Sequence, residues 1–300
     1  MNFIIKPSLL SMALIFSFAA WAGEEEAAEE QDVDTSSTVE SEGATSAEDA
    51  AAAMARALQD ALANIKMLAT DNTIGLNGGR LEDETNFNFQ LQPVYSIPTS
   101  EDSRVNYIAR AVIPIIGIEP TVVWPPIGPE PTPPVDSTWG LSDTTLQLFI
   151  SPKSDSAWKW GIGPQVSLAT NTSDRTKGPG WGAGIAGVIV GGAGNWGFSA
   201  IALYHKGEDD FENVGIQPMI FYNFPNHPGL VLGYNNMITY NVNGDSGQKW
   251  NIPLGLTLSK TWALDSGNGF DAGIGYYKVV EHPDNAPDSQ IKIALSWIFN

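Results

Sequence analysis

Apolar and polar residues alternate one by one along much of this chain, and the segment Lys249 to Trp262 shows the pattern most clearly. Its apolar positions are Trp250, Ile252, Leu254, Leu256 and Leu258. The residues between them are small or polar, so a β-strand would present one wholly apolar face. This period of two predicts a strand and not a helix. Such a face packs on a second sheet in a soluble sandwich, or contacts lipid in an outer-membrane barrel.

The same alternation of apolar and polar residues recurs from Met67 to the end of the chain. It predicts twelve strands, at Met67–Asn77, Asn86–Ile97, Val105–Ile116, Thr144–Ser151, Trp158–Thr170, Gly182–Gly191, Trp196–His205, Val214–Phe224, Leu230–Val242, Lys249–Trp262, Phe270–Glu281 and Gln290–Phe299. Short connections alternate with longer polar ones, of which the Pro-rich segment Glu119 to Gly140 is the longest. Short periplasmic turns that alternate with long external loops are typical of a bacterial barrel.

The predicted inner face of this sheet is rich in amides. In the strand Asn86–Ile97, apolar residues such as Phe87 and Phe89 alternate with Asn and Gln, which we place inside. The residues predicted to line a pore are Arg110, Lys292, Asn88, Gln90, Gln147, Gln165, Gln217, Asn235 and Asn251. Because the inner face of a soluble sandwich must be apolar, this pattern favours an all-β fold, a transmembrane antiparallel up-and-down β-barrel of about twelve strands.

The N-terminal part of the chain has a different composition. Residues 1–22 are typical of a secretory signal peptide, with Lys6, an apolar run and a predicted cleavage after Ala22; an uncleaved anchor is the alternative. Residues 23–46 are acidic and poor in apolar residues, which predicts a disordered linker. Residues 47–66 are predicted to form a periplasmic or plug helix, and residues 67–300 the outer-membrane barrel. Export by a signal peptide together with a barrel fold predicts a location in the cell outer membrane.

The Ala-rich segment from Ala47 to Leu68 is a strong helix former. Its larger apolar residues form one narrow stripe, Met54, Leu58, Leu62, Ile65 and Leu68. A narrow stripe is typical of a coiled coil, which would make a homo-oligomer, or of a helix docked on or in the barrel mouth. A single frayed helix is the third interpretation, because isolated helices of this length are only marginally stable.

Composition narrows the chemistry further. The chain contains no cysteine, which excludes disulfides and thiolate chemistry. Its formal net charge of -19 would repel a phosphate backbone, so nucleic acid is not an expected partner. The expected partners are outer-membrane lipid and lipopolysaccharide, the barrel-insertion machinery during assembly, and a small-molecule solute. No cofactor is predicted.

The sequence gives little support for an enzyme or a metal site. His205, His227 and His282 lie near strand ends or in turns at different ends of the predicted barrel, so they cannot share one reaction centre. We therefore predict no catalytic residue and no metal ligand. Arg110 and Lys292 are the inward charges that could favour anionic solutes. The alternative is that they pair with internal carboxylates, for which Asp143 and Asp271 are the candidates.

Several segments resemble one family of Gram-negative outer-membrane proteins. They are FQLQPVYSIP, IARAVIPII, the Pro-rich loop, GLSDTTLQLFISP, WKWGIGP, GPGWGAG, IQPMIFYNFP, WNIPLGLTLSK, YYKVVEHPDNAPD and the closing alternating strand. In this order they resemble outer-membrane proteins described as transporters, some of which carry the misleading label neuromedin U, and which are related to the phenol meta-pathway degradation family. The resemblance covers roughly Asn86 to Asn300. It implies a barrel fold and a transport role without fixing a substrate.

Barrel size and resemblance together give the functional prediction. Barrels of about eight strands are filled by side chains and those of about sixteen leave an open channel, so twelve strands predict a narrow or plugged pore. The leading interpretation is a passive channel or transporter for small solutes, including hydrophobic or aromatic ones. The alternative is a structural or partner-binding barrel with a closed lumen and an N-terminal oligomerisation helix. A barrel enzyme is the remote third.

Overall fold

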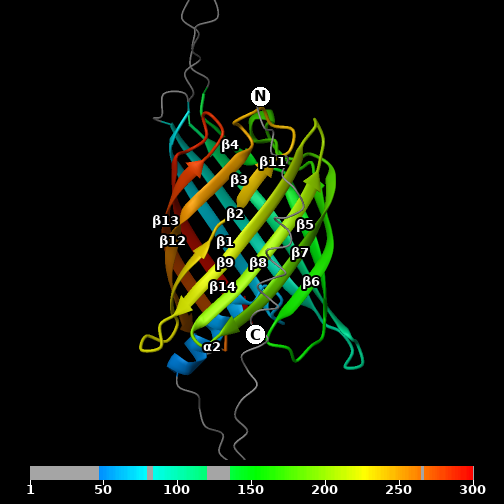
Figure 1. Cartoon of the computed structure of the whole chain (residues 1–300), viewed down its shortest axis with the longest axis vertical. Coiled ribbons are helices and arrows are strands. Elements are labelled where there is room, and N and C mark those ends of the chain that lie inside the picture. The colour runs from blue at the N-terminus through cyan, green and yellow to red at the C-terminus, as the bar shows by residue number, and fades with distance from the viewer. Residues whose placement is uncertain (1–46, 80–83, 120–135, 265–266, 300) are drawn as a thin grey trace, which may run out of the picture. The chain divides into compact units, whose positions relative to one another are not determined.

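The computed structural model describes residues 47–79, 84–119, 136–264 and 267–299. The strands of this part of the chain form one antiparallel sheet that closes on itself (Figure 1). Closure occurs where the first strand pairs with the last, with Lys66 opposite Phe299 and Leu76 opposite Ser289. A closed barrel satisfies its backbone hydrogen bonds internally, which is what a strand-built membrane protein requires.

The described residues contain one α-helix, one 3-10 turn and fourteen strands. They are α2 (Ala47–Gln59), β1 (Lys66–Gly78), β2 (Glu84–Ile97), β3 (Val105–Ile118), β4 (Thr138–Leu141), β5 (Thr144–Pro152), β6 (Lys159–Leu168), η1 (Asp174–Thr176), β7 (Gly182–Ala193), β8 (Trp196–Lys206), β9 (Glu212–Asn223), β10 (Leu230–Asn235), β11 (Ile238–Asn241), β12 (Trp250–Ala263), β13 (Gly269–Glu281) and β14 (Ser289–Phe299). Both β4 and β5 pair with β3, and both β10 and β11 lie between β9 and β12. The strands therefore occupy twelve positions around the barrel, which confirms the predicted fold.

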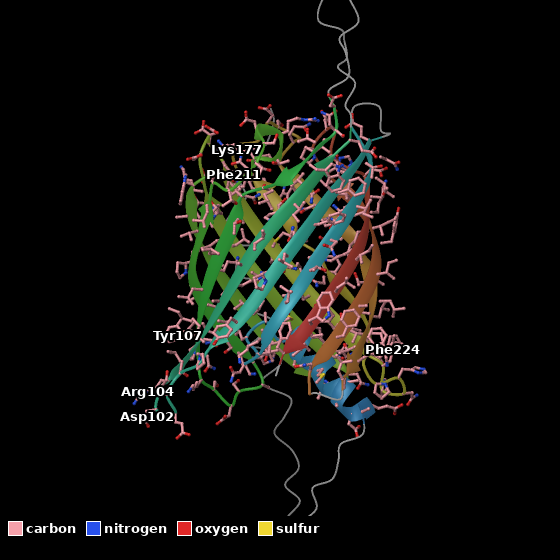
Figure 2. All side chains as sticks on the ribbon, turned by 180° about the vertical axis from the view of Figure 1, so that it is seen from behind. Asp102, Arg104, Tyr107, Lys177, Phe211 and Phe224 are labelled. Carbon is pink, nitrogen blue, oxygen red and sulfur yellow. The ribbon has the colours of Figure 1, made fainter. Side chains whose placement is uncertain are left out.

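Large apolar side chains cover the outside of the barrel. Figure 2 shows Arg104 and Asp102 at the end of the barrel that carries α2, which we call the helix end, and Lys177 at the opposite end, the loop end. Exposed tryptophans gather near both ends, with Trp160, Trp196, Trp262 and Trp297 near the helix end and Trp139, Trp181 and Trp250 near the loop end. Two aromatic girdles around an apolar band are typical of outer-membrane barrels.

One position of the barrel wall is interrupted between β10 and β11. The strand β10 pairs with β12 as far as Gly233, opposite Thr257, and β11 resumes the pairing at Thr239. Across this gap the Tyr234 hydroxyl donates a hydrogen bond of 2.8 Å to the carbonyl oxygen of Pro253. Proline has no N–H to offer a neighbouring strand, so it fits a place where the ladder is broken.

The helix is shorter than the sequence predicts, because α2 ends at Gln59 and not at residue 66 or Leu68. The Asp60 carboxylate accepts the Leu62 N–H at 2.8 Å in the turn that follows. From Lys66 onward the backbone is needed for the β1 pairings with β2 and β14, and this pairing outweighs helix propensity. The predicted signal peptide and acidic linker, residues 1–46, lie outside the described residues.

The buried face of the helix also differs from the predicted stripe. The buried positions of this segment are Ala51, Ala55, Gln59 and Leu62, of which only Leu62 belongs to the predicted set. Alanines allow the helix to lie close to the strand ends, and α2 contacts β8, β9, β10, β12 and β13. No helix in the described part of the chain has the length and apolarity to cross a membrane.

Candidate functional site: the lumen of the barrel

The interior of the barrel holds two cavities, one above the other. The cavity at the loop end has a volume of about 1090 Å³, and the cavity at the helix end has a volume of about 190 Å³. We call them the upper and the lower cavity. Four side chains border both of them, namely Asp71, Gln92, Arg110 and Gln217. These four side chains and Lys292, which is bonded to Asp71, form a group between the two spaces that we call the polar belt.

The nine residues predicted to line a pore all border these cavities. Asn88, Gln90, Gln147, Gln165 and Asn251 line the upper cavity, Lys292 and Asn235 line the lower cavity, and Arg110 and Gln217 border both. Their side chains alternate with outward-facing residues on each strand, as the period of two requires. A role for these residues in passing a solute stays a prediction.

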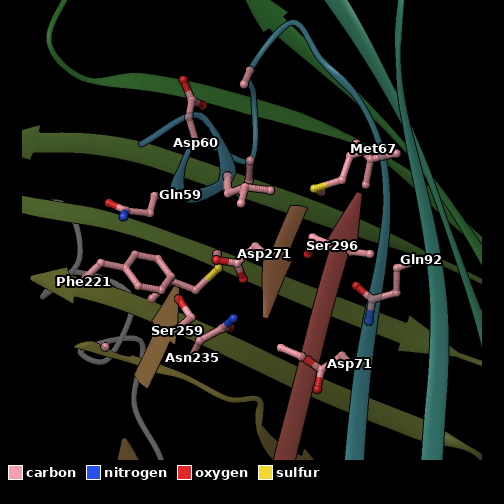
Figure 3. Close-up of a pocket in the computed structure, with 18 of the residues that line it drawn as sticks. Gln59, Asp60, Met67, Asp71, Gln92, Phe221, Asn235, Ser259, Asp271 and Ser296 are labelled. Atoms are coloured by element: carbon pink, nitrogen blue, oxygen red, sulfur yellow. The ribbon is translucent and has the colours of Figure 1, made fainter. Parts of the chain in front are cut away.

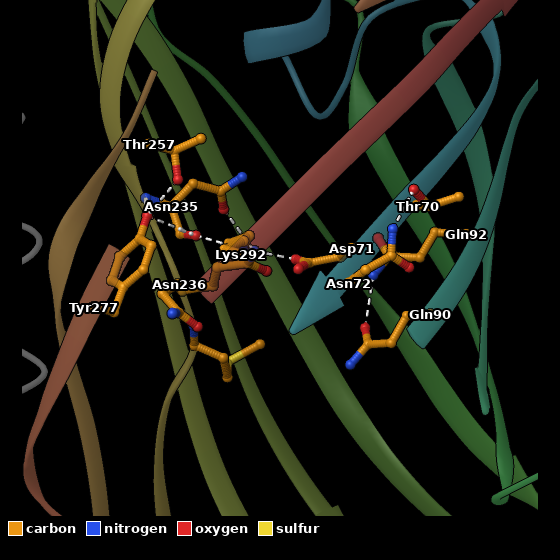
Figure 4. A network of polar contacts seen from close by, with 12 residues as sticks. Thr70, Asp71, Asn72, Gln90, Gln92, Asn235, Asn236, Thr257, Tyr277 and Lys292 are labelled. Carbon is orange, nitrogen blue, oxygen red and sulfur yellow. Dashed lines mark hydrogen bonds and ion pairs between the residues drawn. The ribbon is translucent and has the colours of Figure 1, made fainter. Parts of the chain in front are cut away.

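Lys292 is held in the polar belt by an ion pair with Asp71 (Figure 4). Its Nζ lies 2.9 Å from Asp71 Oδ2 and 2.5 Å from the carbonyl oxygen of Asn235. The side chain of Lys292 is only 2% exposed, and a buried ammonium needs such partners. The Asn235 carbonyl is free to accept because β10 ends at this residue and the ladder to β12 is already broken.

The predicted carboxylate partners of the inward cations were wrong. Asp143 lies in the break between β4 and β5, where its two oxygens accept the backbone N–H groups of Thr170, Asn171, Gly178 and Gly180 at 2.7–3.1 Å. Asp271 accepts a hydrogen bond of 2.8 Å from the Thr261 hydroxyl at the helix end. Neither carboxylate forms an ion pair with Arg110 or Lys292 within the part of the chain that the structure describes.

Arg110 starts a row of hydrogen bonds that runs along the polar belt. Its Nη1 donates to Gln147 Oε1 at 3.2 Å and its Nη2 donates to Gln92 Oε1 at 2.8 Å. Gln147 Nε2 then donates to Gln165 Oε1 at 2.6 Å, and Gln165 Nε2 lies 2.9 Å from His205 Nδ1. Because arginine can only donate, it fixes which end of each amide faces which neighbour.

This direction also decides how His205 is bonded to Ser167. Gln165 donates to Nδ1, so the neutral ring carries its proton on Nε2 and donates it to Ser167 Oγ at 2.9 Å. A catalytic serine instead gives its proton to the histidine, whose Nδ1–H is held by an acceptor. The Ser167–His205 contact therefore has the spacing of a nucleophile and a base with the opposite direction of donation.

Small residues of β7 allow these contacts across a whole strand. Gly184 is opposite Gln165 on one side and opposite His205 on the other. A side chain at Gly184 would overlap the Tyr204 carbonyl oxygen and crowd the His205 ring. The absence of a side chain at Gly184 therefore allows Gln165 and His205 to meet.

The lower cavity, some of whose lining residues are drawn in Figure 3, is apolar along one run of strands and more polar along another. The apolar wall comes from β2, β3, β5, β8 and β9, with Val94, Ile108, Phe149, Ile201, Met219 and Phe221. The polar wall comes from β12, β13 and β14, with Ser259, Thr261, Asp271 and Ser296. At the helix end the cavity is bordered by Leu58, Gln59 and Asp60, so α2 and the turn after it form its floor.

The helix is fastened to the barrel by a reciprocal amide pair. Gln59 Nε2 donates to Asn223 Oδ1 at 2.8 Å, and Asn223 Nδ2 donates back to Gln59 Oε1 at 3.1 Å. The Ser199 hydroxyl donates to the Gln59 carbonyl oxygen at 3.2 Å, and Lys159 pairs with Asp60 at 2.9 Å. These contacts place the C-terminal end of α2 inside the mouth of the barrel.

The loop end carries charged groups but no metal centre among the described residues. Lys177 lies 2.5 Å from Asp209 and 3.5 Å from Glu208, and the hydrogen bond that its ammonium donates to the Asp209 carboxylate raises the pKa of Lys177. His282 Nδ1 donates a hydrogen bond of 2.9 Å to the carbonyl oxygen of the adjacent Pro283. Within residues 47–79, 84–119, 136–264 and 267–299, no three His, Cys, Asp or Glu side chains are arranged to hold a metal ion.

The fold is similar to that of solved outer-membrane proteins. An outer membrane channel from Pseudomonas putida F1 is 13% identical, and the alignment covers 80% of this chain and 97% of that one with a TM-score of 0.54. The outer membrane phospholipase A of Escherichia coli is also 13% identical, with 79% and 96% covered and a TM-score of 0.40. No protein-family model and no curated protein sequence matches the chain. At 13% identity the likeness to the Pseudomonas putida channel shows a shared fold, that of an outer-membrane barrel.

Three features of this site escaped sequence analysis. Asp71, the partner of Lys292, lies on β1, a strand for which sequence analysis assigned no inward-facing residue. Tyr277 is fully buried and its hydroxyl accepts from the Asn235 N–H at 3.3 Å, a contact between distant segments that no local pattern reveals. The break after Asn235 lies inside one continuous alternating segment and has no sequence signal.

Proposed function

We propose that this protein is a passive outer-membrane channel for small solutes whose helix end is closed by α2. The observation that carries the proposal is the pair of cavities on either side of one polar belt inside a closed barrel. A lumen lined by amides and a few charges is typical of a solute path, whereas a purely structural barrel can fill its interior with side chains. The barrel fold and the resemblance of residues 86–300 to described transporters support the same function.

The nature of the solute follows from the lower cavity. Its apolar wall would accommodate an apolar or aromatic group better than it would a fully hydrated ion. We therefore propose small hydrophobic or aromatic solutes, which would pass when α2 leaves the mouth of the barrel. The outer membrane, reached through a signal peptide that is cleaved after Ala22, is the proposed location.

Single-channel recording of the refolded protein in planar bilayers tests this function. We expect small, discrete conductance steps from the mature protein, and larger steps from a variant without residues 47–59, because α2 forms the floor of the lower cavity. A barrel that folds, as shown by its heat-modifiable mobility on gels, but conducts in neither form would contradict the proposal. That result would favour the structural or partner-binding barrel.

An oligomerisation role for the helix is the alternative that the deletion also tests. The buried residues Ala51, Ala55 and Gln59 of α2 face the chain's own barrel. Of the predicted coiled-coil stripe, Leu58 borders the lower cavity and Leu62 is buried, so the face that would join a second copy is partly used within the chain's own barrel. Loss of a dimer or trimer in the deletion variant, with unchanged conductance, would support the oligomerisation role.

A further inference from the structure

The two cations of the polar belt differ in how their charges are balanced. Lys292 faces the carboxylate of Asp71 at 2.9 Å. Arg110 is bonded to the neutral amides of Gln92 and Gln147, and none of the carboxylates that the structure describes lies within ion-pair distance of it. Asp71 attracts Arg110 from farther away but is already bonded to Lys292. Arg110 therefore brings a positive charge into the lumen without an anion of its own.

The guanidinium keeps donors for a ligand. It has five N–H groups in a planar fork, and Gln92 and Gln147 each take one of them. Arg110 borders both the upper and the lower cavity, so a molecule in either space can approach it. A fork of this kind matches a carboxylate, which can accept two parallel hydrogen bonds.

An apolar surface lies directly beside Arg110 on the side of the helix end. Ile108 precedes Arg110 by two residues on the same face of β3, and Val94 is opposite Arg110 on β2. On β5, Gln147 is opposite Arg110 and Phe149 is opposite Ile108. All of these side chains border the lower cavity or the belt above it. One end of a ligand would thus meet a positive charge while its other end meets hydrocarbon.

We propose that the lumen binds small amphipathic monocarboxylates, with the carboxylate on Arg110 and the apolar body in the lower cavity. The proposal deepens the channel function proposed above and rests on it for its biological meaning. A cavity of about 190 Å³ is sufficient for one ring, since an apolar cavity of roughly 150 Å³ holds benzene. The Asp271 carboxylate on the other wall, which forms no ion pair among the described residues, would repel a second negative charge, which favours monoanions.

Calorimetric titration of the full-length mature barrel in detergent with benzoate and with its neutral analogue benzamide tests this site. We expect benzoate to bind at least tenfold more tightly than benzamide, and the preference to disappear in Arg110→Gln. In Arg110→Lys the charge remains but the fork is lost, so an intermediate preference is expected. The matched control is Arg104→Gln, because Arg104 is exposed in a turn at the helix end. Equal binding of both probes by the wild type, or undiminished preference in Arg110→Gln, would overturn the proposal.

A second variant tests the position of the apolar body and leaves Arg110 untouched. Ala294 borders the lower cavity, so Ala294→Leu should fill part of it and weaken benzoate binding severalfold while formate binding stays unchanged. Wild-type benzoate affinity in Ala294→Leu would refute the assignment to the lower cavity. Gel mobility with and without heating identifies folded samples. Conductance without a preference for benzoate would reject this site and retain the channel, whereas benzoate binding without conductance would retain the site and reject the channel.

Discussion

Lys292 and Asp71 join the last strand of the barrel to its first strand. In the β1–β14 pairing, Lys292 is opposite Thr73 and Asp71 is opposite Ala294, so the ion pair of 2.9 Å crosses the seam diagonally. This seam is where the two ends of the sheet must find each other during folding. An ion pair at that place makes the native pairing register of β1 and β14 more stable than registers shifted by one or two residues.

Removal of one partner at the seam should be more harmful than removal of both. Asp71→Asn leaves the Lys292 ammonium buried without an anion, and we expect the free energy of unfolding to fall by about 3 kcal/mol. The double variant Asp71→Asn with Lys292→Met should lose less stability than Asp71→Asn alone, because no buried charge is left without a partner. Urea unfolding in lipid or detergent, followed by gel mobility, measures these differences. Additive losses would show that the two residues act independently.

The amide pair between Gln59 and Asn223 should control how firmly α2 closes the barrel. Gln59→Ala removes both hydrogen bonds and leaves Asn223 partly unpaired, which should weaken helix docking by about 1–3 kcal/mol. We expect more frequent openings to a larger conductance, at unchanged barrel stability. Glu48→Gln is the control, because Glu48 is exposed at the start of the helix. Identical recordings from Gln59→Ala and the wild type would contradict this role.

Asp143 should hold the connection between β6 and β7 in place. Its carboxylate accepts four backbone N–H groups and is 2% exposed, so Asp143→Asn would turn an NH2 group toward some of these donors. We expect a loss of about 1–3 kcal/mol in local stability. Hydrogen exchange at Gly178 and Gly180 should accelerate. Asp174→Asn, an exposed change in the same connection, should leave the exchange rates as they are.

The row from Arg110 to Ser167 depends on the absence of a side chain at Gly184. Gly184→Ala should cost about 1–3 kcal/mol, because the new methyl group overlaps the Tyr204 carbonyl oxygen. Gly187→Ala, three residues away on the same strand, meets only the Gly161 carbonyl oxygen at 3.9 Å and should be tolerated. Heat-modifiable gel mobility and urea unfolding compare the two variants. Equal stability of both would show that the crowding is relieved elsewhere.

The alternation of residues was sufficient to predict all twelve strand positions. It also predicted which residues face inward, because a strand in a barrel has one lipid face and one lumen face throughout its length. The helix length was wrong, because the pairing of Lys66 onward with two strands is a long-range effect that local propensity cannot reveal. Ion-pair partners were also wrong, since sequence proximity to a strand end does not say at which height in the barrel a carboxylate lies.

Contacts that depend on broken strands were the least predictable part of the site. Asp143 was expected in the lumen, yet a two-residue break between β4 and β5 turns it toward the backbone of a neighbouring connection. The carbonyl of Asn235 became a ligand of Lys292 for the same reason. An interruption of one or two residues leaves the alternating pattern almost intact, so a sequence that reads as a continuous strand can hide it.

The donor-only end at Arg110 gives the row of amides a single sense, and this restricts what protonation can do inside the barrel. A second proton on His205 would make the far end of the row donor-only as well. Two N–H donors would then face each other at one place in the row. An amide that turns its oxygen toward one neighbour turns its NH2 group toward the other, which then has no acceptor. Protonation of His205, near the loop end, would therefore remove one hydrogen bond from the row. If both glutamines turn, the lost bond is the one between Gln147 and Arg110, at the middle of the barrel.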